Sequence, residues 1–316
     1  MKQRLKYGYP IGAISVAVLV FGDFLLYIFI SIFALLLLRE FFQLTGLRTE
    51  RKLFPMRRWG YLLSLLILTL VYFKLSEYLD LAIVVFIMAA FIYRMAYFTR
   101  KSDGFLRDLS ISILGGIYIG GFMSFFFRLR ELGIDLKAMG IIPIGNNWLA
   151  LIPFLGNVLE QAGWTTGVGH AMHDGPNWLV ILPIVGSWGY DFSAFFTGTL
   201  LGRTPLAPSI SPKKSIEGMI GGLIGCGTAT VLIARFIGID SGYFLLLFIM
   251  GLVMGTFSQL GDLCISSIKR EAGAKDSSAA IPGHGGWLDK CDGLLFVLPV
   301  SYYFIHFALL ISSHLK

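Results

Sequence analysis

The sequence has few charged residues and few cysteines. Only 14% of its 316 residues are charged, whereas 56% are hydrophobic. Soluble domains carry about 25% charged residues, so this composition excludes an ordinary soluble domain and predicts several apolar spans of about 20 residues. The three cysteines, Cys226, Cys264 and Cys291, have no metal-binding spacing, and their odd number gives no complete disulfide framework.

Acidic residues are the scarcer of the two charged classes. The chain has 19 Asp and Glu against 26 Lys and Arg, which gives a formal net charge of +7. In a chain this apolar, a basic surplus is typical of cytoplasmic loops that face anionic lipids. We therefore expect membrane lipids, and not nucleic acid, as the partner of the basic segments.

Long apolar runs dominate the rest of the sequence. They predict an all-α fold, a polytopic integral membrane protein with about nine transmembrane helices. The first run, residues 10–38, is interrupted at Gly22-Asp23 and is long for one span, so we expect two helices, the first starting near Arg4. The other predicted spans are 59–73, 79–93, 109–127, 178–201, 216–237, 243–260 and 293–311. The pattern leaves residues 136–177 unassigned.

Basic residues are distributed unevenly over the predicted loops. With the N-terminus in the cytoplasm, 20 of the 26 Lys and Arg residues fall on the cytoplasmic side of nine spans. The positive-inside rule therefore favours a cytoplasmic N-terminus. It also places on the cytoplasmic side the loops 202–215 and 269–292, which belong to the two polar segments described next.

One polar segment, residues 262–292, lies between the last two apolar runs. It holds four Asp, one Glu, three Lys, one Arg and one His. Carboxylates suit Mg²⁺, whereas Lys and Arg bind phosphate oxygens. Its Pro282-Gly-His284-Gly-Gly286 run cannot form a helix interior, and the glycines let backbone N–H groups approach an anion. The composition indicates phosphate chemistry, although a solvated, positively charged loop shares the general pattern.

A second polar segment extends over residues 191–218. Prolines at 205, 208 and 212 exclude a continuous helix there. Four side chains on the short loop can donate hydrogen bonds to phosphate: Ser209, Ser211, Lys213 and Lys214. The free N–H groups of the helix that follows Ser215 also favour an anion. A turn with a helix cap and snorkelling lysines is the alternative that this pattern leaves open.

Together, the two segments resemble the phosphatidate cytidylyltransferases, also called CDP-diacylglycerol synthases. The later segment matches the family signature at Ser266-x-x-Lys269-Arg270, Lys275-Asp276 and Pro282-x-His284-Gly285-Gly286-x-x-Asp289-x-x-Asp292. The earlier segment matches at Asp191, Ala194, Gly198, Ser211-Pro-Lys-Lys214, Glu217 and Gly218. The chain departs from the family at Phe192, Phe195, Thr199, Ser215, Trp287, Lys290 and Cys291. These departures bear on substrate detail more than on the class of reaction.

The resemblance implies transfer of CMP from CTP to phosphatidate, which gives CDP-diacylglycerol and pyrophosphate. It implies a membrane catalytic domain at residues 101–316, preceded by N-terminal transmembrane helices at 1–100. The expected cofactor is Mg²⁺, with or without a second metal ion. We expect Asp262 and Asp289 to bind metal, with Asp276 and Asp292 as second choices.

The remaining expected site residues divide into two groups. The residues expected to act in catalysis, beside Asp262 and Asp289, are Lys269, Arg270 and His284. The residues expected to bind substrate are Asp191, Ser209, Ser211, Lys213, Lys214, Ser266, Lys275, Gly285 and Gly286.

Two other functions fit parts of the sequence. CTP-dependent polyprenol or phytol kinases share the Pro-Lys-Lys region, but they lack the long segment that ends at Asp292. A membrane transporter is the alternative outside enzyme chemistry, since Asp191 and Asp262 could line an ion path. The absence of an inverted repeat argues against a transporter. The sequence also leaves a homodimer open.

Overall fold

The computed structural model describes residues 24–46, 57–96, 105–138, 178–280 and 285–314. The predicted first span, nearly all of the unassigned segment 136–177, and His284 lie outside these ranges. Nearly all of the described chain is helical, and its sole sheet is a two-stranded hairpin. The prediction of an all-α fold is confirmed in this sense.

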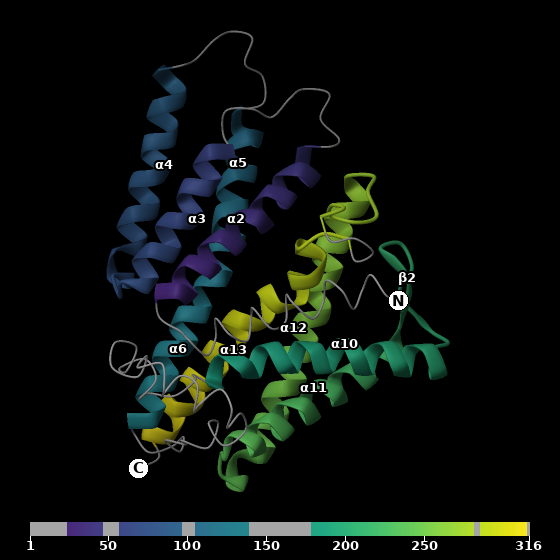
Figure 1. The fold of residues 1–316 in the computed structure, drawn as a ribbon. Helices are drawn as coiled ribbons and strands as arrows, with labels where there is room; N and C mark the ends of the chain where they lie inside the picture. Colours follow the sequence, from purple (N-terminus) through teal and green to yellow (C-terminus); the bar gives the residue numbers. More distant parts are fainter. Residues whose placement is uncertain (1–23, 47–56, 97–104, 139–177, 281–284, 315–316) are drawn as a thin grey trace, which may run out of the picture.

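The first group of elements runs from α2 to α6 (Figure 1). It contains α2 (Phe24–Gly46), α3 (Arg57–Tyr72), η1 (Ser76–Tyr78), α4 (Leu79–Ala96), α5 (Phe105–Gly115), the π-helical turn η2 (Gly116–Gly121) and α6 (Phe122–Ala138). Small residues let η2 approach α3 closely, since a Cβ on Gly120 would meet the backbone of Ser64.

The second group carries both polar segments. It contains η3 (Trp178–Val180), α10 (Ile181–Leu201), β1 (Pro205–Ala207), β2 (Ser211–Ser215), α11 (Ile216–Ile237), η4 (Ser241–Tyr243), α12 (Phe244–Glu271) and α13 (Leu288–His314). The two strands are antiparallel and pair Pro205 with Ser215. Glycines again allow close helix packing, because a Cβ on Gly225 of α11 would meet Ser193 of α10.

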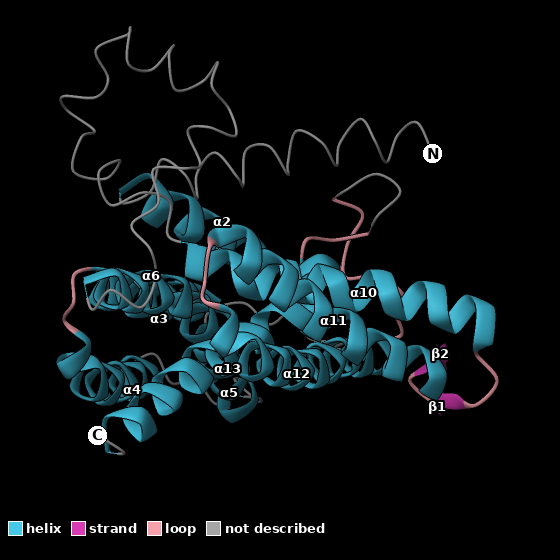
Figure 2. Cartoon of the chain, turned by 90° about the horizontal axis from the view of Figure 1, so that it is seen from below, coloured by secondary structure: helices cyan, strands magenta, loops and turns pink. Residues whose placement is uncertain are grey.

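One continuous hydrophobic core joins the two groups. It extends from Leu37 and Leu38 on α2 to Leu295 and Leu298 on α13, all of them fully buried. Figures 1 and 2 show the hairpin at the edge of the molecule far from α4. The division of the chain near residue 100 stays a prediction, although the core does not stop there.

Six helical segments in the described ranges are long and apolar enough to cross a membrane. They are Phe24–Gly46, Ser76–Tyr93, Arg107–Leu136, Ile216–Ile237, Ser241–Glu271 and Leu288–Ile311. The prediction of a membrane protein is therefore confirmed, whereas the count of nine spans is not. Two of the predicted spans, 59–73 and 178–201, are helical at α3 and α10 but do not belong to these six.

Several helices extend further than the apolar runs predict. The span 216–237 coincides with α11, whose ends are a Ser215 cap and a left-handed Gly238. In contrast, α2 continues to Gly46 and α12 to Glu271, where the sequence predicts loops from residues 39 and 269. Those loop predictions are wrong at their starts, because charged residues there find partners inside the protein and stay in the helix.

Candidate active site

The hairpin is anchored at the start of α11. The Glu217 carboxylate accepts hydrogen bonds from Arg203 N at 3.1 Å and from the Thr204 hydroxyl at 2.8 Å. Ser215 caps the helix by accepting a bond from Gly218 N at 3.1 Å. The three prolines that exclude a helix thus leave a strand pair whose second strand leads directly into α11. This arrangement fixes Lys213 and Lys214 two residues and one residue before the cap, respectively.

The hairpin contacts the end of α12, so the two polar segments meet. The Lys214 ammonium forms a salt bridge with Asp262, and Arg270 Nε donates to the Ile210 carbonyl at 3.1 Å. A second Arg270 nitrogen donates to the Ala274 carbonyl, also at 3.1 Å. The expectation that loops 202–215 and 269–292 lie on one side is met in these contacts. Arg270 ties the two loops together and makes no contact with a carboxylate in the described part of the chain.

The helical extension of α12 aligns three of the predicted residues. Asp262, Ser266 and Lys269 are four and then three residues apart, so they lie along one face of the helix. The Ser266 hydroxyl donates to Asp262 at 3.1 Å, and only 7% of Ser266 is exposed. Ser266, predicted to bind substrate, therefore orients the Asp262 carboxylate in this structure.

Asp289, in the first turn of α13, is the most fully bonded carboxylate of the signature. Its Oδ1 accepts from Lys269 Nζ at 2.6 Å. Its Oδ2 lies within 2.9 Å of Ser277 N, Ser277 Oγ and Gly286 N. The Lys269 and Asp289 side chains are each 10% exposed. A metal-binding role for Asp289 stays a prediction. In this structure its hydrogen bonds hold the preceding loop against α12.

Gly285 and Gly286 are adjacent in the loop, and each position requires glycine for a different structural reason. Gly285 has φ +83°, a left-handed conformation that favours glycine. Gly286 is buried, and a Cβ there would collide with the Ser277 hydroxyl and with the carboxylate of Glu40. The sequence predicts that the backbone at Gly285-Gly286 approaches an anion closely. At Gly286 the backbone does approach anions, and these are the carboxylates of Glu40 and Asp289.

Glu40 on α2 is the residue that sequence reasoning missed. Its Oε1 accepts from Ser278 Oγ at 2.7 Å and from Trp287 N at 3.0 Å. Its Oε2 accepts from Ser277 Oγ at 2.9 Å and from Leu288 N at 2.8 Å. Glu40 is 4% exposed, and an acidic residue is almost never buried without partners. One signal in the sequence could have found it. Glu40 is an acidic residue that follows a run of 16 residues, Phe24–Arg39, with only one charged side chain.

Two further carboxylates, Asp191 and Asp292, interact electrostatically with the Lys214–Asp262 pair. Asp191 on α10 interacts with Asp262 and with the positive charges of Lys214 and Lys290. Asp292 interacts with Asp262 and Asp191 across the α12–α13 packing, where Gly261 lies against the Asp292 carbonyl. The donors are all oxygens, which suit Mg²⁺. Among the described residues, however, no three acidic, His or Cys side chains are close enough to hold one ion.

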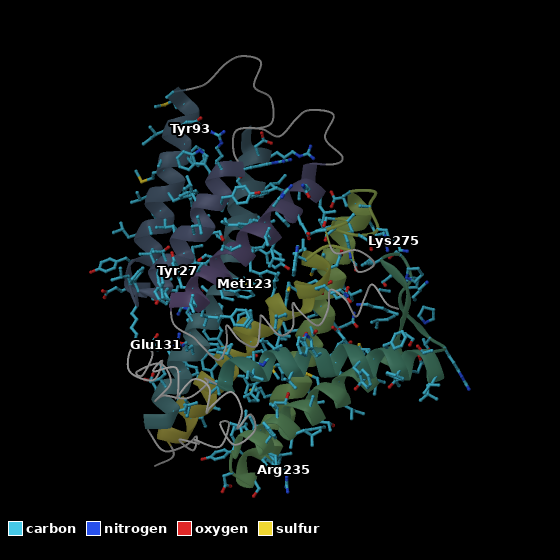
Figure 3. All side chains as sticks on the ribbon, in the orientation of Figure 1. Tyr27, Tyr93, Met123, Glu131, Arg235 and Lys275 are labelled. Carbon is cyan, nitrogen blue, oxygen red and sulfur yellow. The ribbon has the colours of Figure 1, made fainter. Side chains whose placement is uncertain are left out.

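The other predicted residues in the described ranges lie mostly at the surface. Lys213, Ser209, Lys275 and Asp276 are exposed, and Ser211 is partly buried at the start of β2. Figure 3 shows Lys275 and Tyr93 toward one end of the molecule, with Glu131 and Arg235 toward the other. All three cysteines are free, as their number and spacing suggest, and Cys291 is buried beside Asp292.

Comparison with known proteins gives consistent matches. Residues 2–308 match the cytidylyltransferase family. Two chloroplastic proteins of Arabidopsis thaliana, phosphatidate cytidylyltransferases 5 and 4, are 30% and 32% identical over 311 residues, 96% of this chain and 71% and 73% of theirs. The phosphatidate cytidylyltransferase of Thermotoga maritima is 43% identical over 129 residues, which is 39% of this chain and 47% of that protein. The chain therefore belongs to the cytidylyltransferase family of nucleotidyltransferases.

Proposed function

We propose that this membrane protein transfers CMP from CTP to phosphatidate, giving CDP-diacylglycerol and pyrophosphate. The observation that carries the proposal is the contact of the basic hairpin with α12, where Lys214 pairs with Asp262. It brings phosphate-binding cations and carboxylates from distant segments to one site. The family membership and the names of the relatives supply the substrates.

The reaction requires two anions to meet. A phosphate oxygen of phosphatidate forms a new bond to the α-phosphorus of CTP, while the bond from that phosphorus to the bridging oxygen breaks and pyrophosphate leaves. The attacking oxygen is already anionic, so the site must neutralise charge and align the reactants more than remove a proton. Basic side chains beside a lipid headgroup are suited to both tasks.

The lysines divide into two classes for this purpose. Lys213 and Lys275 are exposed and form no salt bridge with a described carboxylate, so we propose that they contact incoming phosphate. Lys214 and Lys269 are held by Asp262 and Asp289. We propose that Lys214 exchanges part of this pairing for a phosphate oxygen of CTP, because its side chain is still 24% exposed.

A magnesium ion fits the donor set around Asp262. Mg²⁺ keeps several waters and is usually held by one or two carboxylates together with substrate phosphates. Asp262 and Asp292, with Asp191 nearby, would supply these carboxylates, and Lys214 would then be free for phosphate. The bound ion would neutralise charge on the triphosphate. We also propose that the site faces the cytoplasm, where CTP is available; the excess of Lys and Arg in these loops supports this orientation.

The position of the radiolabel in the product tests the proposed reaction. Purified protein in phosphatidate-containing vesicles is given CTP labelled either at the α-phosphate or at the γ-phosphate. Cytidylyl transfer puts only the α-label into lipid, and it releases the γ-label as pyrophosphate. A lipid kinase would put only the γ-label into lipid, and that result would overturn the proposal. Asp262→Asn serves as the matched inactive protein.

A further inference from the structure

We infer that Glu40 of α2 is a positioning residue of the transferase site, acting through the loop between α12 and α13. Among the described residues, its four hydrogen-bond donors all belong to the signature region: Ser277, Ser278, Trp287 and Leu288. Two of them are backbone N–H groups at the start of α13, where no intrahelical acceptor exists. A buried carboxylate from the N-terminal helices thus caps the helix that carries Asp289 and Asp292.

The two oxygens of Glu40 are used symmetrically, which makes the carboxylate hard to replace. Each oxygen accepts one serine hydroxyl and one backbone N–H. Glutamine has the same shape but only one acceptor oxygen, and its amide nitrogen donates. In either orientation the amide nitrogen would face a backbone N–H that cannot become an acceptor, so one buried donor would lose its partner.

The influence of Glu40 reaches α12 through two further contacts. The Ser277 hydroxyl lies 2.9 Å from both Glu40 Oε2 and Asp289 Oδ2, and its single hydrogen serves one of them at a time. Asp289 in turn holds Lys269 at 2.6 Å. Trp287 packs edge-on against Phe33 of α2, with ring centroids 5.5 Å apart, and so fixes the same loop to the same helix. Glu40 therefore sets where Asp289 and Lys269 lie.

Glu40→Gln in the full-length, detergent-solubilised protein tests this inference by two measurements. Hydrogen–deuterium exchange at residues 285–288 should accelerate by about tenfold or more, because bonds to a charged acceptor are lost, while α10 and α11 keep their protection. The kcat per monodisperse protein should fall by about tenfold or more, with the KM for CTP changed less than about twofold, because the hairpin is untouched. A merely structural role would lower the yield of folded protein without changing this kcat.

Two further variants keep the test decisive. Glu131→Gln makes the same chemical change at an exposed salt bridge with Lys74, and it should alter neither measurement. Glu40→Asp retains both oxygens on a shorter side chain, and it should give values between those of the wild type and Glu40→Gln; it also serves if the amide variant does not fold. Unchanged exchange at 285–288 in both Glu40 variants, or unchanged kcat, would overturn the inference.

The inference rests on the proposed function for its activity measurement only. Exchange in the absence of substrate reports on the loop whatever the reaction is. A wild-type protein that fails to form CDP-diacylglycerol would therefore refute the proposed function, whereas unaltered loop exchange would refute the role of Glu40.

Discussion

At the scale of single residues, the signature contains an ion pair between Lys269 and Asp289. The fixed spacing of Asp289 and Asp292 marks these residues in the sequence, and the structure places both at the start of α13. The contacts of this region are not visible from spacing. Lys269, which donates to Asp289, lies on a different helix, and Glu40, which accepts from Leu288 N, lies 248 positions before it. The sequence thus predicts which residues matter in this region but not which contacts they make.

Asp289→Asn should abolish turnover, with a loss of about 100-fold or more in kcat. The substitution leaves Lys269 buried without its counter-ion, and breaking such a pair costs about 3–5 kcal/mol of stability. The measurement is kcat together with the thermal unfolding midpoint in detergent. The double variant Asp289→Asn, Lys269→Met should recover most of the midpoint and remain inactive. Near-normal turnover of the single variant at low Mg²⁺ would contradict the role of the carboxylate.

Gly286→Ala should be far more harmful than Gly273→Ala. The first places a Cβ against Ser277 and Glu40, and the resulting displacement should reduce activity to less than about a tenth. The second introduces a side chain at φ +71° with no atom nearby, which costs about 1–2 kcal/mol of backbone strain without a collision. Activity and unfolding midpoints of both variants provide the comparison, and equal loss of activity would refute the steric argument.

At the scale of elements, the sequence predicted helix boundaries that local signals set. It did not predict boundaries that depend on tertiary contacts. The Ser215 cap and Gly238 define α11 by local chemistry alone. The extension of α2 past Arg39 brings Glu40 to N–H donors at the start of α13, and no local pattern contains these partners. The prolines predicted a break in the helix before α11. The pairing of β1 with β2 could be seen only in the three-dimensional structure.

The two lysines of β2 should have separable effects. Lys213→Ala removes an exposed cation that has no described carboxylate partner, so it should raise the KM for CTP about tenfold and leave the KM for phosphatidate nearly unchanged. Lys214→Ala should raise the KM for CTP as well, and it should also lower kcat because Asp262 loses its counter-ion. Both constants are measured with the second substrate saturating. A larger effect on the KM for phosphatidate would assign the hairpin to the lipid headgroup.

At the scale of the whole molecule, the helices bring two polar segments to the same end. The positive-inside count predicted that both loops face one side, and their contact at Lys214–Asp262 and Arg270–Ile210 agrees with it. The count of nine spans depended on treating every apolar run as a crossing, whereas α3 and α10 are helices that are not among the six long, apolar candidates in the described ranges. The N-terminal helices, which resembled generic spans in the sequence, contribute Glu40 to the signature loop.

The central claim is that the hairpin and the α12–α13 loop form one nucleotide site on the cytoplasmic face. Single cysteines at Ser209 and at the exposed Ala279, in an active background in which Cys226, Cys264 and Cys291 are replaced by alanine, test it most directly. An impermeant thiol reagent should label neither position in intact cells. It should label both in inverted vesicles, and CTP should slow labelling at both. Labelling of either position from outside intact cells, or protection by CTP at only one of them, would contradict the claim.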